Sequence, residues 1–312
     1  MRASMLLSSA ARCRPGRGLP CLVMSGVLWG TGGLTGILLS RVTGLSALSV
    51  AAYRLTAGGV LIVAFLTLTG RRWPASRAAW ARIAVIGALA ALYQSCYFIA
   101  VALTSVALAT LVAIGTAPVI VLGVHWVTGH RTGRLAPVAA CLALTGLGLL
   151  VGLPSGFSEA KVLASTGLAI LAAAGFAAVT LTGTRPVAGL DDLTMTGFGF
   201  TAGGLVLMPL AAALGGLAFR PGPEAIGLLI ALSTGPTAVA YSLYFRGLRT
   251  AAASTGALLA LLEPLTGTIL AALVLGQHLS ASGIAGAAIL ALAVIITIFD
   301  ADHGADLIPR LG

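Results

Sequence analysis

Charged residues are scarce in this chain. They make up 8% of its 312 residues, whereas 58% are hydrophobic, and the mean hydropathy is +1.05. A water-soluble domain of this length does not have such a composition. A net charge of +10 could suggest a nucleic-acid partner. The arginines lie in short links between apolar runs, however, so we expect no nucleic-acid binding and attribute the charge to membrane topology.

Motifs for enzymatic chemistry are also missing from the sequence. The four cysteines form no CxxC pair, the four histidines are scattered, and no phosphate-binding loop, HExxH sequence or nucleophile elbow occurs. Almost no chain is left outside the apolar runs for a soluble catalytic domain. We therefore expect no enzyme, no metal site and no cofactor. No ATP-binding module is recognisable either.

Long apolar runs are what the sequence does contain. A bilayer core of about 30 Å is crossed by roughly 20 apolar residues in a helix, which predicts an all-α integral membrane protein with ten transmembrane helices. The apolar run near the N-terminus is too short for a signal peptide, so we interpret residues 1–18 and 300–312 as cytoplasmic tails. The predicted helices are 19–40, 45–69, 79–103, 105–128, 135–153, 163–184, 192–214, 224–248, 251–275 and 281–299.

The basic residues predict the orientation of these helices. An even number of spans puts both termini on one side, and fourteen Lys and Arg residues fall on that side. Only Arg41, Lys161 and Arg220 fall on the other, and Arg54 lies within the second predicted helix. By the positive-inside rule both termini are cytoplasmic. The predicted location is the plasma (inner) membrane, with the lipid bilayer as partner; a monomer and a homodimer both stay open.

Two apolar segments share a proline-containing pattern. TSVALATLVAIGTAP (104–118) aligns without a gap with TAAASTGALLALLEP (250–264), at an offset of 146. The alignment pairs Pro118 with Pro264 and places Ala117 opposite Glu263. Paired, interrupted hydrophobic segments at matching places in two halves indicate the binding site of a transporter built from repeats.

The repetition extends to other segments. LTAGGV (55–60) aligns with FTAGGL (200–205) at an offset of 145, and Trp29 aligns with Phe176 at an offset of 147. A unit of five helices has an odd number of spans, so its second copy enters the membrane from the opposite face. We therefore predict two inverted five-helix repeats, residues 19–153 and 163–299. Two near-equivalent halves suit alternating access.

Glu263 is the acid that lies deepest in a predicted helix. A carboxylate at the bilayer centre costs on the order of 2.5–3.5 kcal/mol on insertion scales, and Pro264 is expected to leave the Ala260 carbonyl without its helical donor. The carboxyl is either structural, bonded to that carbonyl, or functional, carrying a proton or pairing with a substrate ammonium. Arg54 likewise either snorkels or braces a carbonyl, or binds an anion.

Polar residues at helical spacing predict which faces line a cavity. In the eighth predicted helix, polar residues recur every three or four positions, so they share one face of the helix. Gln94 and Tyr97 of the third predicted helix align with Tyr241 and Tyr244 of the eighth at an offset of 147. The alternative is hydrogen bonding between helices. The candidate substrate-binding residues are Trp29, Gln94, Tyr97, Thr234, Thr237, Tyr241 and Glu263. The candidate coupling or gating residues are Glu263, Arg54, Pro118 and Pro264.

Four short sequences carry a family resemblance. They are LWG (28–30), YRLTAGG (53–59), YFRGL (244–248) and the more specific LLEPLTGTILAALVLGQ (261–277). With them the chain resembles an EamA-type permease of the drug/metabolite transporter superfamily, over nearly its whole length. The resemblance implies ten helices with cytoplasmic termini, a cavity lined by helices 1, 3, 4, 6, 8 and 9, and export of small metabolites or drugs.

The chain departs from the family pattern at two helix ends. Gln277 stands where family members usually have a glutamate, and His130 follows Gly129 in the first half. A role for that acid in gating or coupling is therefore not transferred to this chain.

The sequence thus predicts a secondary carrier that exports a small organic metabolite by alternating access. Aromatic and hydroxyl groups around one acid suit an amino-acid-like or amphipathic drug-like substrate, and protons are the ion that Glu263 could carry. Two other classes stay open. A passive channel would also be apolar with inward polar stripes, and a non-transporting membrane subunit would need a protein partner.

Overall fold

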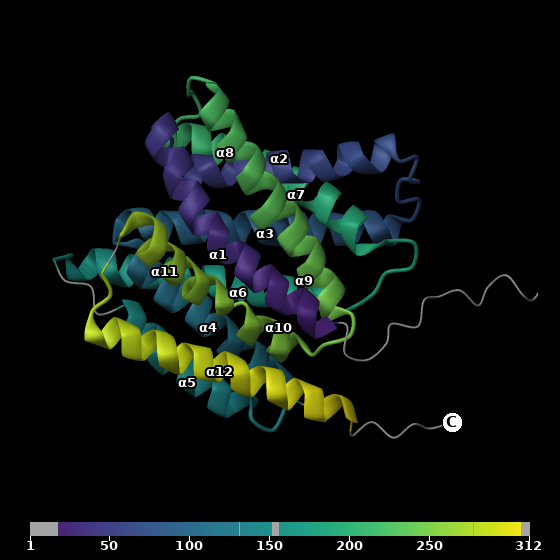
Figure 1. Cartoon of the computed structure of the whole chain (residues 1–312). Helices are drawn as coiled ribbons and strands as arrows, with labels where there is room; N and C mark the ends of the chain where they lie inside the picture. Colours follow the sequence, from purple (N-terminus) through teal and green to yellow (C-terminus); the bar gives the residue numbers. More distant parts are fainter. Residues whose placement is uncertain (1–17, 131, 152–155, 277, 307–312) are drawn as a thin grey trace, which may run out of the picture.

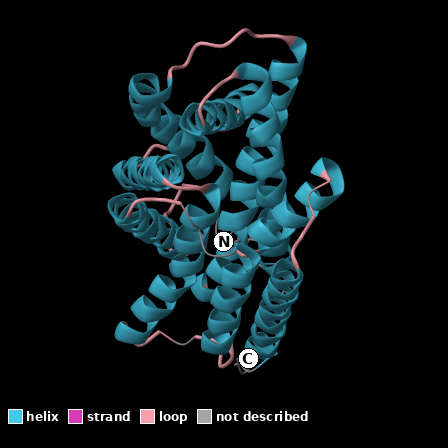
Figure 2. Ribbon diagram, turned by 90° about the vertical axis from the view of Figure 1, so that its left-hand side faces the viewer, coloured by secondary structure: helices cyan, strands magenta, loops and turns pink. Residues whose placement is uncertain are grey.

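The computed structural model describes residues 18–130, 132–151, 156–276 and 278–306, so nearly all of the predicted N-terminal tail, residues 307–312 and Gln277 lie outside the described residues. The first part of the predicted C-terminal tail, residues 300–306, is instead the end of the last helix. All regular elements in the described ranges are helices (Figure 2), which confirms the prediction of an all-α chain. The elements are α1 (Gly18–Thr43), α2 (Ala47–Leu68), α3 (Arg77–Leu103), α4 (Val106–Val127), α5 (Ala136–Val151), α6 (Glu159–Gly183), α7 (Asp192–Gly215), α8 (Pro223–Ser233), the π-helix η1 (Thr234–Val239), α9 (Ala240–Leu248), α10 (Ala253–Leu259), α11 (Leu262–Leu275) and α12 (Ala281–Asp306).

Nine helical segments in the described part of the chain are long and apolar enough to cross a membrane. Two of them combine several elements: α8, η1 and α9 form Pro223–Leu248, and α10 with α11 forms Ala253–Leu275. The remaining apolar helix, α5, has 16 residues and is shorter than these.

Helices α2 and α7 begin in the same way. The side chain of Ser46 accepts a hydrogen bond from the Ser49 amide, and the side chain of Asp191 accepts one from the Thr194 amide. Each N-cap satisfies an amide that the first helical turn leaves without a partner. The two caps are separated by the offset of 145 residues that relates the two TAGG sequences.

The bundle has two ends, which we call side A, where α1 begins, and side B, where α1 stops. At side A, Gly18 of α1 lies against Gly247 at the end of α9. Arg71, after α2, pairs with Asp191, before α7, at 3.7 Å. Each of these pairs joins the start of one segment to the end of another, as antiparallel packing requires.

Side B is joined by neutral hydrogen bonds. The Tyr53 hydroxyl donates to the Leu217 carbonyl at 2.7 Å, and the hydroxyls of Thr104 and Ser165 lie 2.7 Å apart. Both ion pairs among the described residues lie at side A. Side A is also the end to which the sequence assigns the larger number of basic residues.

Helices α2 and α7 lie at one edge of the bundle, and α5 and α12 at the opposite edge (Figure 1). The α2–α7 contact is reciprocal. A Cβ on Gly59 would overlap the backbone of Thr201, and a Cβ on Gly204 would overlap the backbone of Thr56. Both threonine–glycine pairs come from the TAGG sequences, so the same residues meet each other in exchanged roles. A reciprocal contact of this kind is the mark of a two-fold relation.

The contact of α5 with α12 is reciprocal too. A Cβ on Gly146 would lie 2.7 Å from the Leu290 amide nitrogen, and a Cβ on Gly286 would overlap the Leu150 amide. Small residues four apart allow two helix backbones to approach closely in a membrane. Gly146 and Gly286 are 140 residues apart, so they are not equivalent positions at the repeat offsets of 145–147, and this contact shows close glycine packing of α5 on α12.

Helix α1 lies against the junction of α10 and α11. A Cβ on Gly26 would come 2.6 Å from the Leu259 carbonyl oxygen, and a Cβ on Gly30 would come 2.9 Å from the Glu263 carbonyl oxygen. Real Cβ atoms do not make such contacts with backbone. The two glycines therefore allow α1 to approach the place where Glu263 begins its helix.

The ninth segment is broken before its proline. Helix α10 ends at Leu259, and the Glu263 amide donates to the Ala260 carbonyl at 3.0 Å. Pro264 falls in the first turn of α11, where a backbone amide has no helical partner to lose. The prediction that Pro264 leaves the Ala260 carbonyl without a donor is therefore wrong. By contrast, α4 runs unbroken through Pro118.

The eighth segment contains a π-helix around Pro236. Proline has no amide to donate to the Leu232 carbonyl, and the Thr237 hydroxyl donates to that carbonyl instead, at 2.9 Å. The wider turn changes the register of the helix. Thr234 is consequently exposed, whereas Thr237 and Tyr241 are buried. The prediction that the polar residues of this segment form one stripe is wrong for this reason.

Candidate functional site

A small cavity lies at the centre of the bundle, between helices α1, α3, α4, α6 and α9 and the α10–α11 junction. Its volume is about 10 Å³, which is roughly the space that one water needs. The structure therefore leaves little free space at this site. The lining residues are Trp29, Tyr93, Ala113, Ile114, Phe176, Tyr241, Ala260 and Glu263.

The lining contains residues related by the sequence repeat. Trp29 and Phe176 are 147 residues apart, and Ile114 and Ala260 are 146 apart. Ile114 and Ala260 are also the residues four positions before Pro118 and Pro264. The cavity thus lies where equivalent parts of the two halves meet.

Aromatic rings form most of the cavity wall. The Trp29 ring centroid lies 4.8 Å from that of Tyr241, 4.9 Å from that of Tyr244 and 5.9 Å from that of Phe176. Tilted and edge-on pairs at such distances add roughly 0.5–1.5 kcal/mol each beyond burial. The flat faces of aromatic rings are apolar and carry partial negative charge, which suits an amphipathic or cationic ligand.

Three polar groups are concentrated at this aromatic wall. Glu263 lines the cavity and is half-buried. The indole nitrogen of Trp29 and the Nε of Arg54 are buried with no hydrogen-bond partner. Buried polar atoms normally have partners, so unpartnered donors beside a cavity are available to a ligand.

Arg54 and Glu263 are close enough to interact electrostatically, although they form no direct ion pair. The guanidinium of Arg54 reaches α1 at Gly32, where its Nη1 would lie 3.7 Å from an added Cβ. Glu263 of α11 borders the central site, and Arg54 of α2 lies beside α1 near Gly32 without lining the cavity. Such a pair can hold a ligand that carries both charges.

Two tyrosine hydroxyls join neighbouring helices, one toward each end of the bundle. Tyr97 bonds Thr110 at 2.7 Å and joins α3 to α4 near side B. Tyr244 bonds Thr180 at 2.7 Å and joins α9 to α6 near side A. Tyr97 and Tyr244 are equivalent residues at the offset of 147.

The structure brings only some of the sequence candidates to the cavity. Trp29, Tyr241 and Glu263 line it, and Tyr97 lies next to the wall, stacked on Tyr93 with 6.1 Å between ring centroids. Arg54 lies close by, as described above.

Other candidates lie elsewhere. Gln94 is buried two turns beyond Gly87, whose backbone packs against α7, and is not among the lining residues. Thr234 is exposed, and Thr237 is buried beside Gly58 of α2. Pro118 and Pro264 stand one turn from the lining residues Ile114 and Ala260.

Several lining residues were not among the sequence candidates. Tyr93 directly precedes Gln94 in α3. The sequence pattern assigned the cavity-facing position to Gln94, whereas in the structure Tyr93 occupies it. Phe176 was visible as the repeat partner of Trp29. Ala113 and Ile114 carry no polar group, so only their position before Pro118 could have indicated them.

The chain is similar to known proteins over most of its length. Two relatives are YwfM, an uncharacterized transporter of Bacillus subtilis (strain 168), and YicL, an uncharacterized inner membrane transporter of Salmonella typhimurium. YwfM is 28% identical over 277 residues, covering 88% of this chain and 91% of YwfM. YicL is 24% identical over 292 residues, covering 91% of this chain and 96% of YicL.

The fold is shared with a solved protein as well. One crystal structure, 21% identical in sequence, has a TM-score of 0.76 and covers 92% of this chain and 98% of the other. The sequence model described as the EamA-like transporter family matches the chain twice, at residues 16–152 and 164–299. This chain therefore belongs to the EamA-like transporter family, within the drug/metabolite transporter superfamily.

Proposed function

We propose that this chain is a secondary carrier that exports a small organic metabolite by alternating access. The observation that carries the proposal is the small central cavity, bordered by equivalent residues of the two halves and by one acid. Family membership supports transport in general. Direction and location rest on the excess of basic residues at side A, which we take as cytoplasmic, and the printed name of YicL agrees with an inner-membrane location.

The architecture behind this mechanism is ten spans in two inverted repeats. It is supported by the reciprocal contact of α2 with α7, in which Thr56 and Gly59 meet Gly204 and Thr201, the repeat equivalents of Gly59 and Thr56. We count the short α5 as a span because it packs along α12, whose length is sufficient to cross the membrane. Five spans per repeat give the two halves opposite orientations.

The two tyrosine hydrogen bonds act as alternate gates in this mechanism. Separation of Tyr97 from Thr110 opens the cavity toward side B, and separation of Tyr244 from Thr180 opens it toward side A. The described state, with both bonds formed, is the occluded intermediate. A substrate enters or leaves the cavity on the side where the bond is broken, while the bond on the other side remains formed.

The substrate class follows from the charges at the site. Glu263 suits a substrate ammonium, Arg54 suits a carboxylate, and the aromatic wall suits an apolar side chain. An amino-acid-like metabolite carries all three features. Glu263 can also accept a proton when the site is empty, which would couple export to the proton gradient.

The direct experiment compares extracellular metabolites of cells that express the wild-type chain, the Glu263→Gln variant or neither. We expect an amphipathic amine to accumulate outside only with the wild-type chain. Media that do not differ between these cells would count against export. Proteoliposomes should show substrate flux without channel-sized currents, because both gates of a carrier are never open together.

A further inference from the structure

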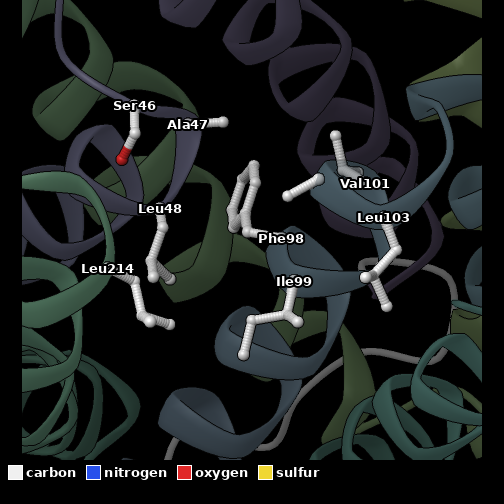
Figure 3. Close-up of a pocket in the computed structure, with 9 residues that line it drawn as sticks. Ser46, Ala47, Leu48, Phe98, Ile99, Val101, Leu103 and Leu214 are labelled. Carbon is white, nitrogen blue, oxygen red and sulfur yellow. The ribbon is translucent and has the colours of Figure 1, made fainter. Parts of the chain in front are cut away.

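A second, larger cavity lies away from the central site, at side B. Its volume is about 490 Å³, within the range of roughly 300–1,000 Å³ typical of small-molecule sites. It is formed by the start of α2, the last turns of α3 and the end of α7. In Figure 3 the ring of Phe98 projects between Leu48 and Leu214 on one side and Val101 and Leu103 on the other.

The equivalent place in the second half is closed by an ion pair. At the offsets of 145 and 147, Ala47 and Ala102 correspond to Asp192 and Arg249. Arg249 binds Asp192 through Nε at 2.7 Å. At side B both alanines border the cavity, so the gap stays open where its counterpart at side A is bridged.

The wall of the side-B cavity offers no free polar anchor. Its one side-chain hydroxyl is that of Ser46, which caps α2 by accepting the Ser49 amide at 3.2 Å and bonds the Ser49 hydroxyl at 2.8 Å. All other lining side chains are apolar. An occupant must therefore bind through apolar contact.

The surroundings of the cavity identify the occupant. Its three helices are long and apolar enough to span a membrane. The rim residue Leu214 is 62% exposed and continues into the exposed apolar face formed by Leu205 and Val206 on the same helix. In a bilayer that face contacts lipid chains. The cavity thus opens to hydrocarbon at the end of the helices, where a lipid is anchored by its headgroup.

We propose that this cavity is a binding site for one acyl chain of a membrane lipid in the side-B leaflet. The site is distinct from the central cavity and does not depend on which metabolite the chain transports. The site is confined to one leaflet because the Asp192–Arg249 pair bridges the equivalent place at side A, and only alanines stand there at side B.

The test uses a phosphatidylglycerol with a diazirine at the end of one acyl chain, added to the purified full chain in detergent at a few equivalents. After irradiation, we expect labelled peptides from the start of α2 and the end of α3, and native mass spectrometry should show one retained lipid per chain. Filling the rim with Ala102→Phe should reduce labelling at least fivefold. The matched control is Ala285→Phe, an exposed alanine at the side-B end of α12, which should label as the wild type does.

A second variant guards against a folding defect. Ala47→Asp combined with Ala102→Arg copies the ion pair of the other half, and it should abolish labelling while keeping the gel-filtration profile and thermal midpoint of the wild type. Labelling spread evenly over the outer helices, or labelling unchanged in both pocket variants, would overturn the proposal. An amphipathic metabolite that binds there in place of the lipid would overturn it as well.

Discussion

The two halves of the bundle share their contacts but not their charges. The TAGG sequences meet reciprocally, Trp29 and Phe176 border one cavity, and each half supplies a tyrosine whose hydroxyl bonds a neighbouring helix. Yet Ala117 in the first half corresponds to Glu263 in the second. The Asp192–Arg249 pair likewise has only alanines as its counterpart. Repetition therefore relates the places where helices meet, and the residues that break the repeat give the two halves different charges.

The largest effect is expected for Glu263→Gln, which makes the two halves alike in charge at the centre. The variant should reach the membrane and lose gradient-driven efflux almost completely, because an amide cannot titrate or pair with an ammonium. Substrate-for-substrate exchange separates the two roles: a proton carrier keeps exchange, and a substrate ligand loses it. The control is Glu159→Gln, an exposed acid at the start of α6. Normal, pH-dependent net efflux by Glu263→Gln would exclude both the proton-carrier role and the substrate-ligand role of Glu263.

The second comparison concerns how closely α1 packs on the α10–α11 junction. Gly30→Ala places a Cβ 2.5 Å from the Thr266 Cβ, and such overpacking typically costs about 1–3 kcal/mol. The thermal midpoint of the purified protein should fall. Gly33→Ala is the matched control, since nothing lies within 4 Å of its added Cβ. Equal midpoints for the two variants would show that the contact is not tight.

The third comparison sets the two gates against each other. Tyr97→Phe and Tyr244→Phe each remove one hydrogen bond, worth about 0.5–1.5 kcal/mol, so each should shift the population of open states by up to about tenfold. The shifts should have opposite directions. Cavity accessibility from each side of the membrane would measure them. Shifts in the same direction would mean that the tyrosines do not form opposed gates.

The smallest effect is expected for the prolines. Pro118→Ala adds an amide inside continuous α4 that can bond the Ile114 carbonyl, which should raise the thermal midpoint slightly and slow transport more than expression. Pro264→Ala adds an amide in the first turn of α11, where no helical partner exists, so its midpoint should not change. If both variants transport at the wild-type rate, the two prolines have no role in transport.

Much of the fold could be predicted from apolar length and repetition. The apolar runs correspond to helical segments, and the TAGG alignment relates residues that meet in space. The break at Ala260 could not be predicted from Pro264 alone, since Pro118 lies in an equivalent sequence within an unbroken helix. Packing against Gly26 and Gly30 distinguishes the two segments.

The site was harder to predict than the fold. Helical spacing grouped Thr234 with Tyr241, but Pro236 induces a π-helix between them, and the register changes. The proline in the middle of the span was visible in the sequence. The hydrogen bond by which the Thr237 hydroxyl replaces the missing amide was not. The aromatic wall also depends on contacts between distant segments, which no local pattern shows.

The central claim, that one closed cavity opens alternately to either side, is tested most directly by labelling a cysteine in it. Ala113→Cys, made in a chain whose four native cysteines are replaced, places a thiol in the lining. A membrane-impermeant maleimide is applied from each side in turn. Labelling from side A should rise and labelling from side B should fall in Tyr244→Phe, and Tyr97→Phe should reverse both changes. Labelling that rises from both sides together, or from neither, would contradict alternating access.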